Sequence, residues 1–160
     1  VRRGATRLAA ARPGRLTEIR LSPGSGAVAL RPLAKAAIDF PVVNEAAPSP
    51  RRHVYAAGYR QETAAYRDLF DAVLKIDATT GAVEKVEFGA GHFVSEAAFA
   101  PAPGGVDEDD GWLLTVNYDA TADDSYLAVL SAAGRPRILA RLSLGQALPM
   151  SFHGLWEPAP

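Results

Sequence analysis

Short runs of apolar residues, each closed by turn-forming residues, are the feature that most restricts how this chain can fold. The runs recur at intervals of roughly 8–12 residues, a spacing typical of all-β sandwiches, barrels and propellers. The clearest pair comprises residues 72–77 and 82–88, joined by a DATTG turn whose glycine can adopt a positive φ angle. Further strands are predicted at residues 15–21, 27–33, 53–59, 112–118, 125–131 and 137–144. We therefore expect an all-β fold.

Two stretches depart from this strand pattern. Residues 62–69 (ETAAYRDL) are the best candidate for a helix. Residues 1–14 are rich in arginine, but Pro13 and Gly14 interrupt any amphipathic helix, so an organelle-targeting peptide is not favoured. We therefore divide the chain into an irregular basic segment, residues 1–14, and a β domain, residues 15–160.

The composition excludes several classes of function. With 17 basic and 18 acidic side chains in 160 residues, the chain has no overall charge that would attract nucleic acid. It contains no cysteine, which excludes disulfides, thiol catalysis and thiolate metal sites, so histidine and carboxylates are the remaining strong metal ligands. The longest apolar stretch, residues 126–133, is too short to span a bilayer. The histidines are His53, His92 and His153.

Three polar residues within apolar surroundings are candidates for chemistry. His153 lies between a phenylalanine and a glycine, where aromatic packing could aim its imidazole, although an ordinary surface histidine is the simpler interpretation. Glu96 lies in a run of small and apolar residues, so its carboxylate is either partnered or at a solvated strand edge. Asp39, in the apolar run 38–43, presents the same alternatives. His53 and His92 are expected in loops or at strand edges.

Other motifs are less informative. The acidic run at residues 107–110 does not match the EF-hand template and is expected to form a turn. The sequence contains no glycine-rich phosphate loop, no GxSxG nucleophile motif and no HExxH motif.

Taken in order, four blocks of this sequence resemble the C-terminal part of the carotenoid cleavage dioxygenase family, including its bacterial lignostilbene dioxygenase branch. The blocks are IDFP at 38–41, LKID at 74–77, EAAFAP at 96–101 followed by EDDG at 108–111, and FHG at 152–154 with Trp156. The resemblance extends from about residue 15 to residue 160. It implies that the chain forms the last two or three blades of a seven-bladed β-propeller.

The resemblance also implies a metal site. In this family four histidines from different blades hold a ferrous ion, Fe(2+), and glutamates orient three of them, an arrangement that suits neutral imidazole ligands. By this pattern His153 is the last iron ligand, and Glu96 is one of the orienting carboxylates. Asp39 falls where the family usually has another such glutamate and is one methylene shorter. The other ligands would lie upstream of Val1, and no further catalytic residue is assigned.

The expected function is therefore that of a fragment of a non-haem iron dioxygenase. Such an enzyme uses O2 to split a C=C bond of a carotenoid, apocarotenoid or stilbene into two carbonyl products. We expect the isolated chain to be inactive, because one histidine and two carboxylates hold ferrous iron weakly. The alternatives are a non-catalytic propeller remnant or binding module, and a complete small β-sandwich.

The expected partners follow from the same resemblance. They are an apolar polyene or stilbene substrate and O2, with neither nucleic acid nor an obligate protein partner. The expected location is the cytoplasm, with peripheral contact between the full-length protein and a membrane surface.

Overall fold

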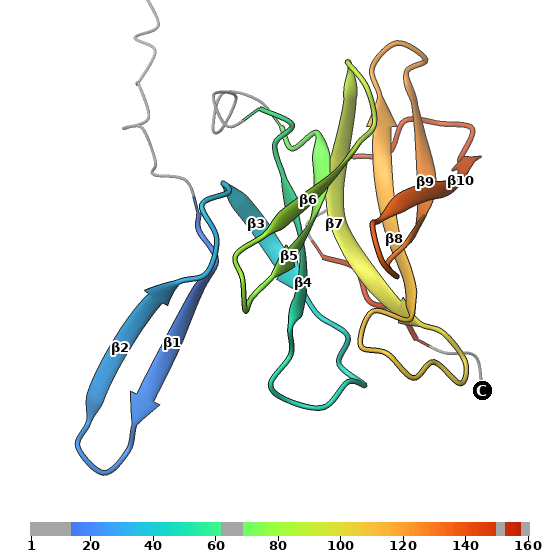
Figure 1. Cartoon of the computed structure of the whole chain (residues 1–160). Coiled ribbons are helices and arrows are strands. Elements are labelled where there is room, and N and C mark those ends of the chain that lie inside the picture. The colour runs from blue at the N-terminus through green and yellow to red at the C-terminus, as the bar shows by residue number, and fades with distance from the viewer. Residues whose placement is uncertain (1–13, 62–68, 150–152, 158–160) are drawn as a thin grey trace, which may run out of the picture.

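The computed structural model describes residues 14–61, 69–149 and 153–157, which form ten strands and no helix (Figure 1). The predicted all-β fold is confirmed for these ranges. No helix within them is long and apolar enough to cross a membrane. The predicted helix at residues 62–69 falls almost entirely outside the described residues, as does most of the basic segment 1–14.

The strands form three antiparallel sheets. A two-stranded hairpin, β1–β2, projects away from the other sheets in Figure 1. The first sheet has the order β3-β4-β5-β6, and the second has the order β10-β9-β8-β7. Each is a four-stranded meander, as in a propeller blade. The strands are β1 (Thr17–Ser22), β2 (Ala27–Pro32), β3 (Ile38–Val42), β4 (His53–Gly58), β5 (Ala72–Asp77), β6 (Val83–Glu87), β7 (His92–Pro101), β8 (Gly111–Asp119), β9 (Asp124–Ser131) and β10 (Arg137–Ser143).

The main core lies between the first and second sheets. Side chains alternate along β8 and β9, so one face of the second sheet is buried against the first sheet. Strand β5 has no such alternation, because a second apolar cluster covers its other face. The main core includes Tyr55, Val73 and Val86 from the first sheet and Val94, Leu113 and Leu130 from the second.

A buried ion pair also joins the two sheets. Lys75 on β5 is 5% exposed, and its Nζ donates to Asp109 Oδ2 at 2.6 Å and to the carbonyls of Ala132 and Gly134 at 2.8 Å. The neighbouring Glu108 accepts hydrogen bonds from the backbone amides of Arg52 and His53, where β4 starts. The acidic run at residues 107–110 therefore forms the expected turn, and this turn connects the sheets.

Strands β3 and β7 each form an edge of their own sheet, and they pack against each other. We call these two the inner strands. Each carries a β-bulge in which two residues oppose one residue of the neighbouring strand. In the β3 bulge, Phe40 and Pro41 together oppose the single residue Ala56 of β4. In the β7 bulge, Ser95 and Glu96 oppose Val116. These two irregularities lie beside the candidate site.

Candidate metal centre

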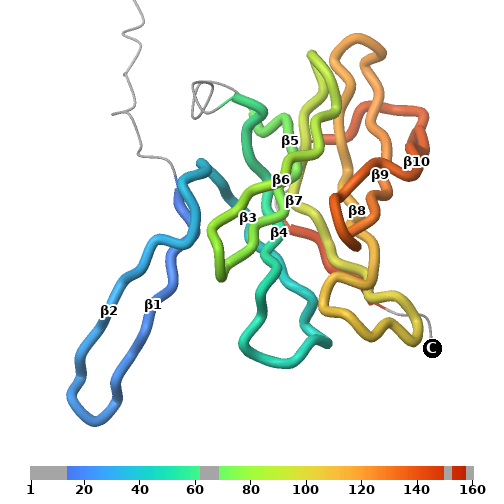
Figure 2. The backbone as a smooth tube through the Cα atoms, in the orientation of Figure 1, coloured from blue at the N-terminus to red at the C-terminus, as the bar shows by residue number. Residues whose placement is uncertain are grey.

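The C-terminal residues 153–157 bring His153 to the inner strands. Figure 2 shows the chain running from β10 into this C-terminal segment, which is drawn in red. Before it reaches this segment, the chain is anchored by a hydrogen bond from the amide of Leu148 to Ser125 Oγ. His153 Nδ1 lies 3.2 Å from Glu96 Oε2, and the amide of Gly154 donates to the same oxygen at 3.1 Å. The sequence-predicted residues Glu96 and His153, 57 positions apart, are therefore in contact.

This contact determines which imidazole nitrogen is available. The Glu96 carboxylate can only accept, so a neutral His153 holds its proton on Nδ1 and presents the lone pair of Nε2. Carboxylates orient metal-binding histidines in proteins in this way. The side chain of His153 is 80% exposed, whereas that of Glu96 is 13% exposed. The imidazole is therefore fixed on one side and open to further ligands on the other.

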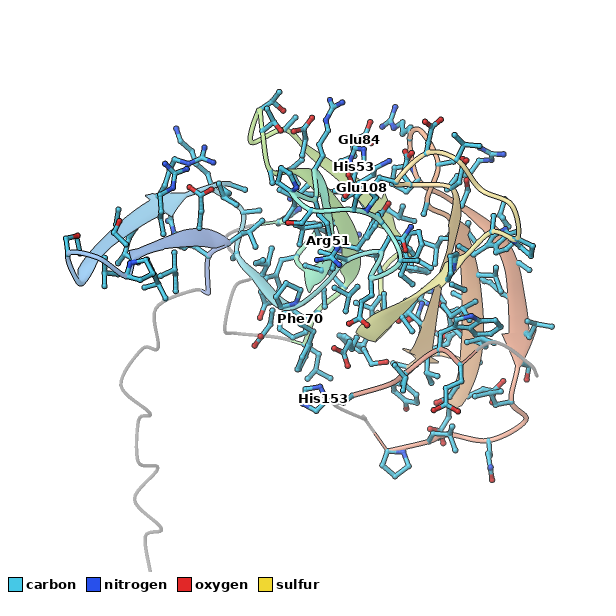
Figure 3. All side chains as sticks on the ribbon, turned by 90° about the horizontal axis from the view of Figure 1, so that it is seen from below. Arg51, His53, Phe70, Glu84, Glu108 and His153 are labelled. Carbon is cyan, nitrogen blue, oxygen red and sulfur yellow. The ribbon has the colours of Figure 1, made fainter. Side chains whose placement is uncertain are left out.

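Phe40 contributes a contact that the sequence analysis did not assign. Its ring meets the His153 ring edge-on, with centroids 5.8 Å apart, and it meets Phe70 at the same distance. In Figure 3, His153 and Phe70 are labelled close together. The signal for this role was the IDFP block, because a phenylalanine before a proline on an edge strand is a favourable place for a bulge.

Asp39 is not brought to the imidazole. It is exposed on β3, and its Oδ1 accepts a hydrogen bond from the amide of Phe40 at 2.9 Å. The shorter acid thus bonds to its own backbone, and its expected role in orienting a metal ligand stays a prediction. Phe152 of the FHG block lies outside the described residues.

The other two histidines lie elsewhere. His92 Nδ1 is 3.1 Å from the Tyr126 hydroxyl, and the amide of His53 donates to Glu108. Figure 3 labels His53 beside Glu108 and far from His153. The described ranges contain no group of three or more histidine or acidic side chains that could hold a metal ion. At this position they bring together one imidazole and one carboxylate, those of His153 and Glu96.

A pocket of about 490 Å³ adjoins this pair. Its lining is largely apolar and comes from β3, the loop that follows it (residues 43–46), β7 and the C-terminal segment, so an apolar ligand could lie against the site. The lining residues include Pro41, Val42, Glu96, Phe99, Gly154 and Trp156.

Comparisons with known proteins give a consistent result. The model of the family described as RPE65, retinal pigment epithelial membrane protein, matches residues 2–158. Apocarotenoid-15,15'-oxygenase of Synechocystis sp. is 33% identical over 146 residues, which are 90% of this chain and 29% of that protein. Chloroplastic carotenoid cleavage dioxygenase 7 of Arabidopsis thaliana is 34% identical over 130 residues, which are 74% of this chain and 21% of that protein.

Solved structures agree. The crystal structure of the cobalt-substituted Synechocystis apocarotenoid oxygenase superposes with a TM-score of 0.86 at 32% identity, covering 97% of this chain and 32% of that one. A chimera of that oxygenase with RPE65 gives a TM-score of 0.83 at 29% identity, covering 92% of this chain and 31% of that one. The predicted propeller-type fold is thus confirmed. The chain spans about a third or less of the length of these relatives.

Proposed function

Because this chain belongs to the RPE65 family, which includes the carotenoid-cleaving oxygenases, we propose that it is the part of such an enzyme that supplies one iron ligand, His153. The contact between Glu96 and His153 carries the proposal, since it places a carboxylate on one imidazole nitrogen and leaves the other as a lone-pair donor. Neutral imidazole is a ligand that ferrous iron accepts.

The proposed reaction converts the C=C bond of an apolar polyene or stilbene and one O2 into two carbonyl groups, and ferrous iron is the group that supplies the activation of O2. Nε2 of His153 would hold the metal. Glu96 retains the proton on Nδ1, and the Gly154 amide fixes the carboxylate. Phe40 restricts the imidazole from its side, and the adjoining pocket would shield an apolar substrate from water. The names of two relatives contain apocarotenoid and carotenoid, which supports a polyene as the class of substrate.

The remaining ligands would come from residues beyond this chain. The described part offers no cluster of three ligands, and a single imidazole holds ferrous iron weakly. The 160-residue chain is accordingly expected to bind iron at far less than one equivalent and to show no turnover.

The test uses a longer protein that carries this segment together with its upstream histidines. His153→Ala is expected to remove both iron and alkene cleavage, while Glu96→Gln is expected to reduce metal affinity or activity about 10–100-fold. His53→Gln is the matched control, because His53 lies apart from the site, and it should retain iron. Normal iron content and rate in His153→Ala would contradict the proposal.

The second candidate is a non-catalytic propeller remnant or binding module. It is the alternative in which the longer protein also lacks the other iron ligands. Iron analysis of the longer protein separates the two, since a remnant would bind none even with His153 intact.

We also propose a peripheral contact of the longer protein with a membrane surface, through which it would collect an apolar substrate from a cytoplasmic location. Co-sedimentation of the longer protein with lipid vesicles tests this contact.

A further inference from the structure

The direction of the Glu96 side chain depends on the β7 bulge. In a regular strand, residues three positions apart lie on opposite faces. Val94 and Ala97 are nevertheless both buried, at 0% and 1% exposure, on the face that packs against the first sheet. The extra residue in the bulge makes this possible, because Ser95 and Glu96 together oppose Val116. Glu96 is thereby left on the strand edge that faces His153.

Two hydroxyl groups hold the bulge. Ser95 Oγ donates to the carbonyl of Val116 at 2.6 Å, and Thr115 Oγ1 lies 3.2 Å from the carbonyl of Ser95. A bulge disrupts the ladder hydrogen bonds locally, and unpaired buried carbonyls are costly. Thr115 is 1% exposed and Ser95 is 7% exposed. The hydroxyls therefore supply hydrogen bonds where the ladder is interrupted.

A chain of buried polar groups supports Thr115. Its Oγ1 also lies 3.1 Å from Asn117 Oδ1, so its single proton is shared between this oxygen and the Ser95 carbonyl. Asn117 Nδ2 lies 3.4 Å from the Tyr126 hydroxyl, which reaches His92 Nδ1. Thr115 and Asn117 occupy the face of β8 that otherwise packs apolar side chains such as Leu113. Polar side chains on such a face are unfavourable unless they are hydrogen-bonded, so these contacts favour one arrangement of the side chains. The network thus restricts the Thr115 side chain.

We propose that Ser95 and Thr115 are positioning residues of the metal centre. Their hydroxyls hold the β7 bulge in the register that delivers the Glu96 carboxylate to His153 Nδ1. They thereby select the imidazole tautomer in which Nε2 is available to a metal. This inference rests on the proposed function, because it assigns a purpose to the tautomer, but the tautomer itself can be measured without a metal.

The experiment records long-range ¹H–¹⁵N correlations of the His153 ring in the full chain at about pH 8. The wild type is expected to show the Nδ1–H tautomer. Thr115→Val, which removes the hydroxyl at nearly constant volume, is expected to shift the ring toward the Nε2–H tautomer. It should also speed hydrogen exchange of the Gly154 amide about tenfold, as expected for loss of one hydrogen bond. Thr115→Ser should restore the wild-type spectrum.

Controls separate positioning from general stability. Ser95→Ala removes only the donor to Val116 and should shift the tautomer as well, so it provides the measurement if Thr115→Val does not fold. Leu130→Ala destabilises the same sheet without removing a hydroxyl and should leave the tautomer unchanged. A wild-type spectrum in Thr115→Val, or a shift in Leu130→Ala, would overturn the inference and leave the proposed function standing. An Nε2–H tautomer in the wild type would instead overturn the Glu96–His153 contact on which both rest.

Discussion

The two inner strands each carry a bulge beside the candidate metal centre, yet the bulges direct their acidic residues differently. On β7, Glu96 lies within the bulge, and its carboxylate meets His153. On β3, Asp39 precedes the bulge and bonds to the amide of Phe40, and it is the Phe40 ring that reaches His153. The comparison shows that two things decide whether an acidic side chain reaches the imidazole. One is its position relative to the extra residue of the bulge, and the other is the length of the side chain.

The two bulges are also stabilised differently. The β7 bulge depends on hydroxyl groups, whereas in the β3 bulge Phe40 adopts a φ angle of 51°. Such a φ is unfavourable for a residue with a bulky side chain, by about 1–3 kcal/mol. Packing of the Phe40 ring against Phe70 and the main core opposes this cost. The β7 bulge is therefore held by side-chain hydroxyls, and the β3 bulge by apolar contacts together with the Asp39–Phe40 hydrogen bond.

The largest expected effect on stability comes from weakening the contact between the two sheets that carry the bulges. Asp109→Asn leaves the buried Lys75 ammonium without a countercharge, which is expected to lower the free energy of unfolding by about 3 kcal/mol. Urea denaturation measures the change. In the control Arg52→Gln, loss of the exposed ion pair with Asp77 should lower the free energy of unfolding far less. Equal losses in the two variants would show that the buried pair does not join the sheets.

Removing the aromatic ring from the β3 bulge is expected to have the next largest effect. Phe40→Ala should reduce the free energy of unfolding by about 2 kcal/mol, because the ring is partly buried against the core. Phe40→Leu keeps most of the apolar volume and should reduce it less. The Glu96–His153 contact remains in both variants, so the tautomer of His153 should not change. A tautomer shift in Phe40→Ala would mean that both bulges determine the imidazole's state.

The contact between the sheets should also depend on pH. Burial opposes ionisation of Asp109, but hydrogen bonds from Lys75 and the amide of Gly134 outweigh it and hold the pKa of Asp109 below its usual range. The folded-state pKa is therefore below that of the unfolded chain, near 4. The resulting stabilisation is present above that pH and is lost as the pH falls through the folded-state pKa. Between about pH 5 and pH 3, the urea midpoint of the wild type should fall more steeply than that of Asp109→Asn; parallel slopes would contradict this.

The same bulges explain where sequence reasoning succeeded and where it failed. Regular alternation correctly predicted the hairpin β1–β2 and the strands β4, β5, β6, β8, β9 and β10. Strand β7 was missed, because the bulge resets the alternation between Val94 and Ala97 and the surrounding residues are small. Family resemblance predicted that Glu96 and His153 belong to one metal site, and the structure brings their side chains into contact. The orientation of Asp39 depends on a backbone hydrogen bond and a bulge position that residue patterns do not encode.

The smallest expected effect concerns Asp39 and tests the comparison most directly. Asp39→Ala removes the acceptor for the Phe40 amide at an exposed position, so the free energy of unfolding should fall by no more than about 1 kcal/mol. Because Asp39 bonds to its own backbone, the His153 ring should remain in the Nδ1–H tautomer. The matched variant Glu96→Ala removes the other acid and should shift the ring toward Nε2–H, as read from the same ¹H–¹⁵N correlations. A shift of similar size in both variants would mean that the two acids act on the imidazole together, and the distinction between a residue before a bulge and a residue within one would fail.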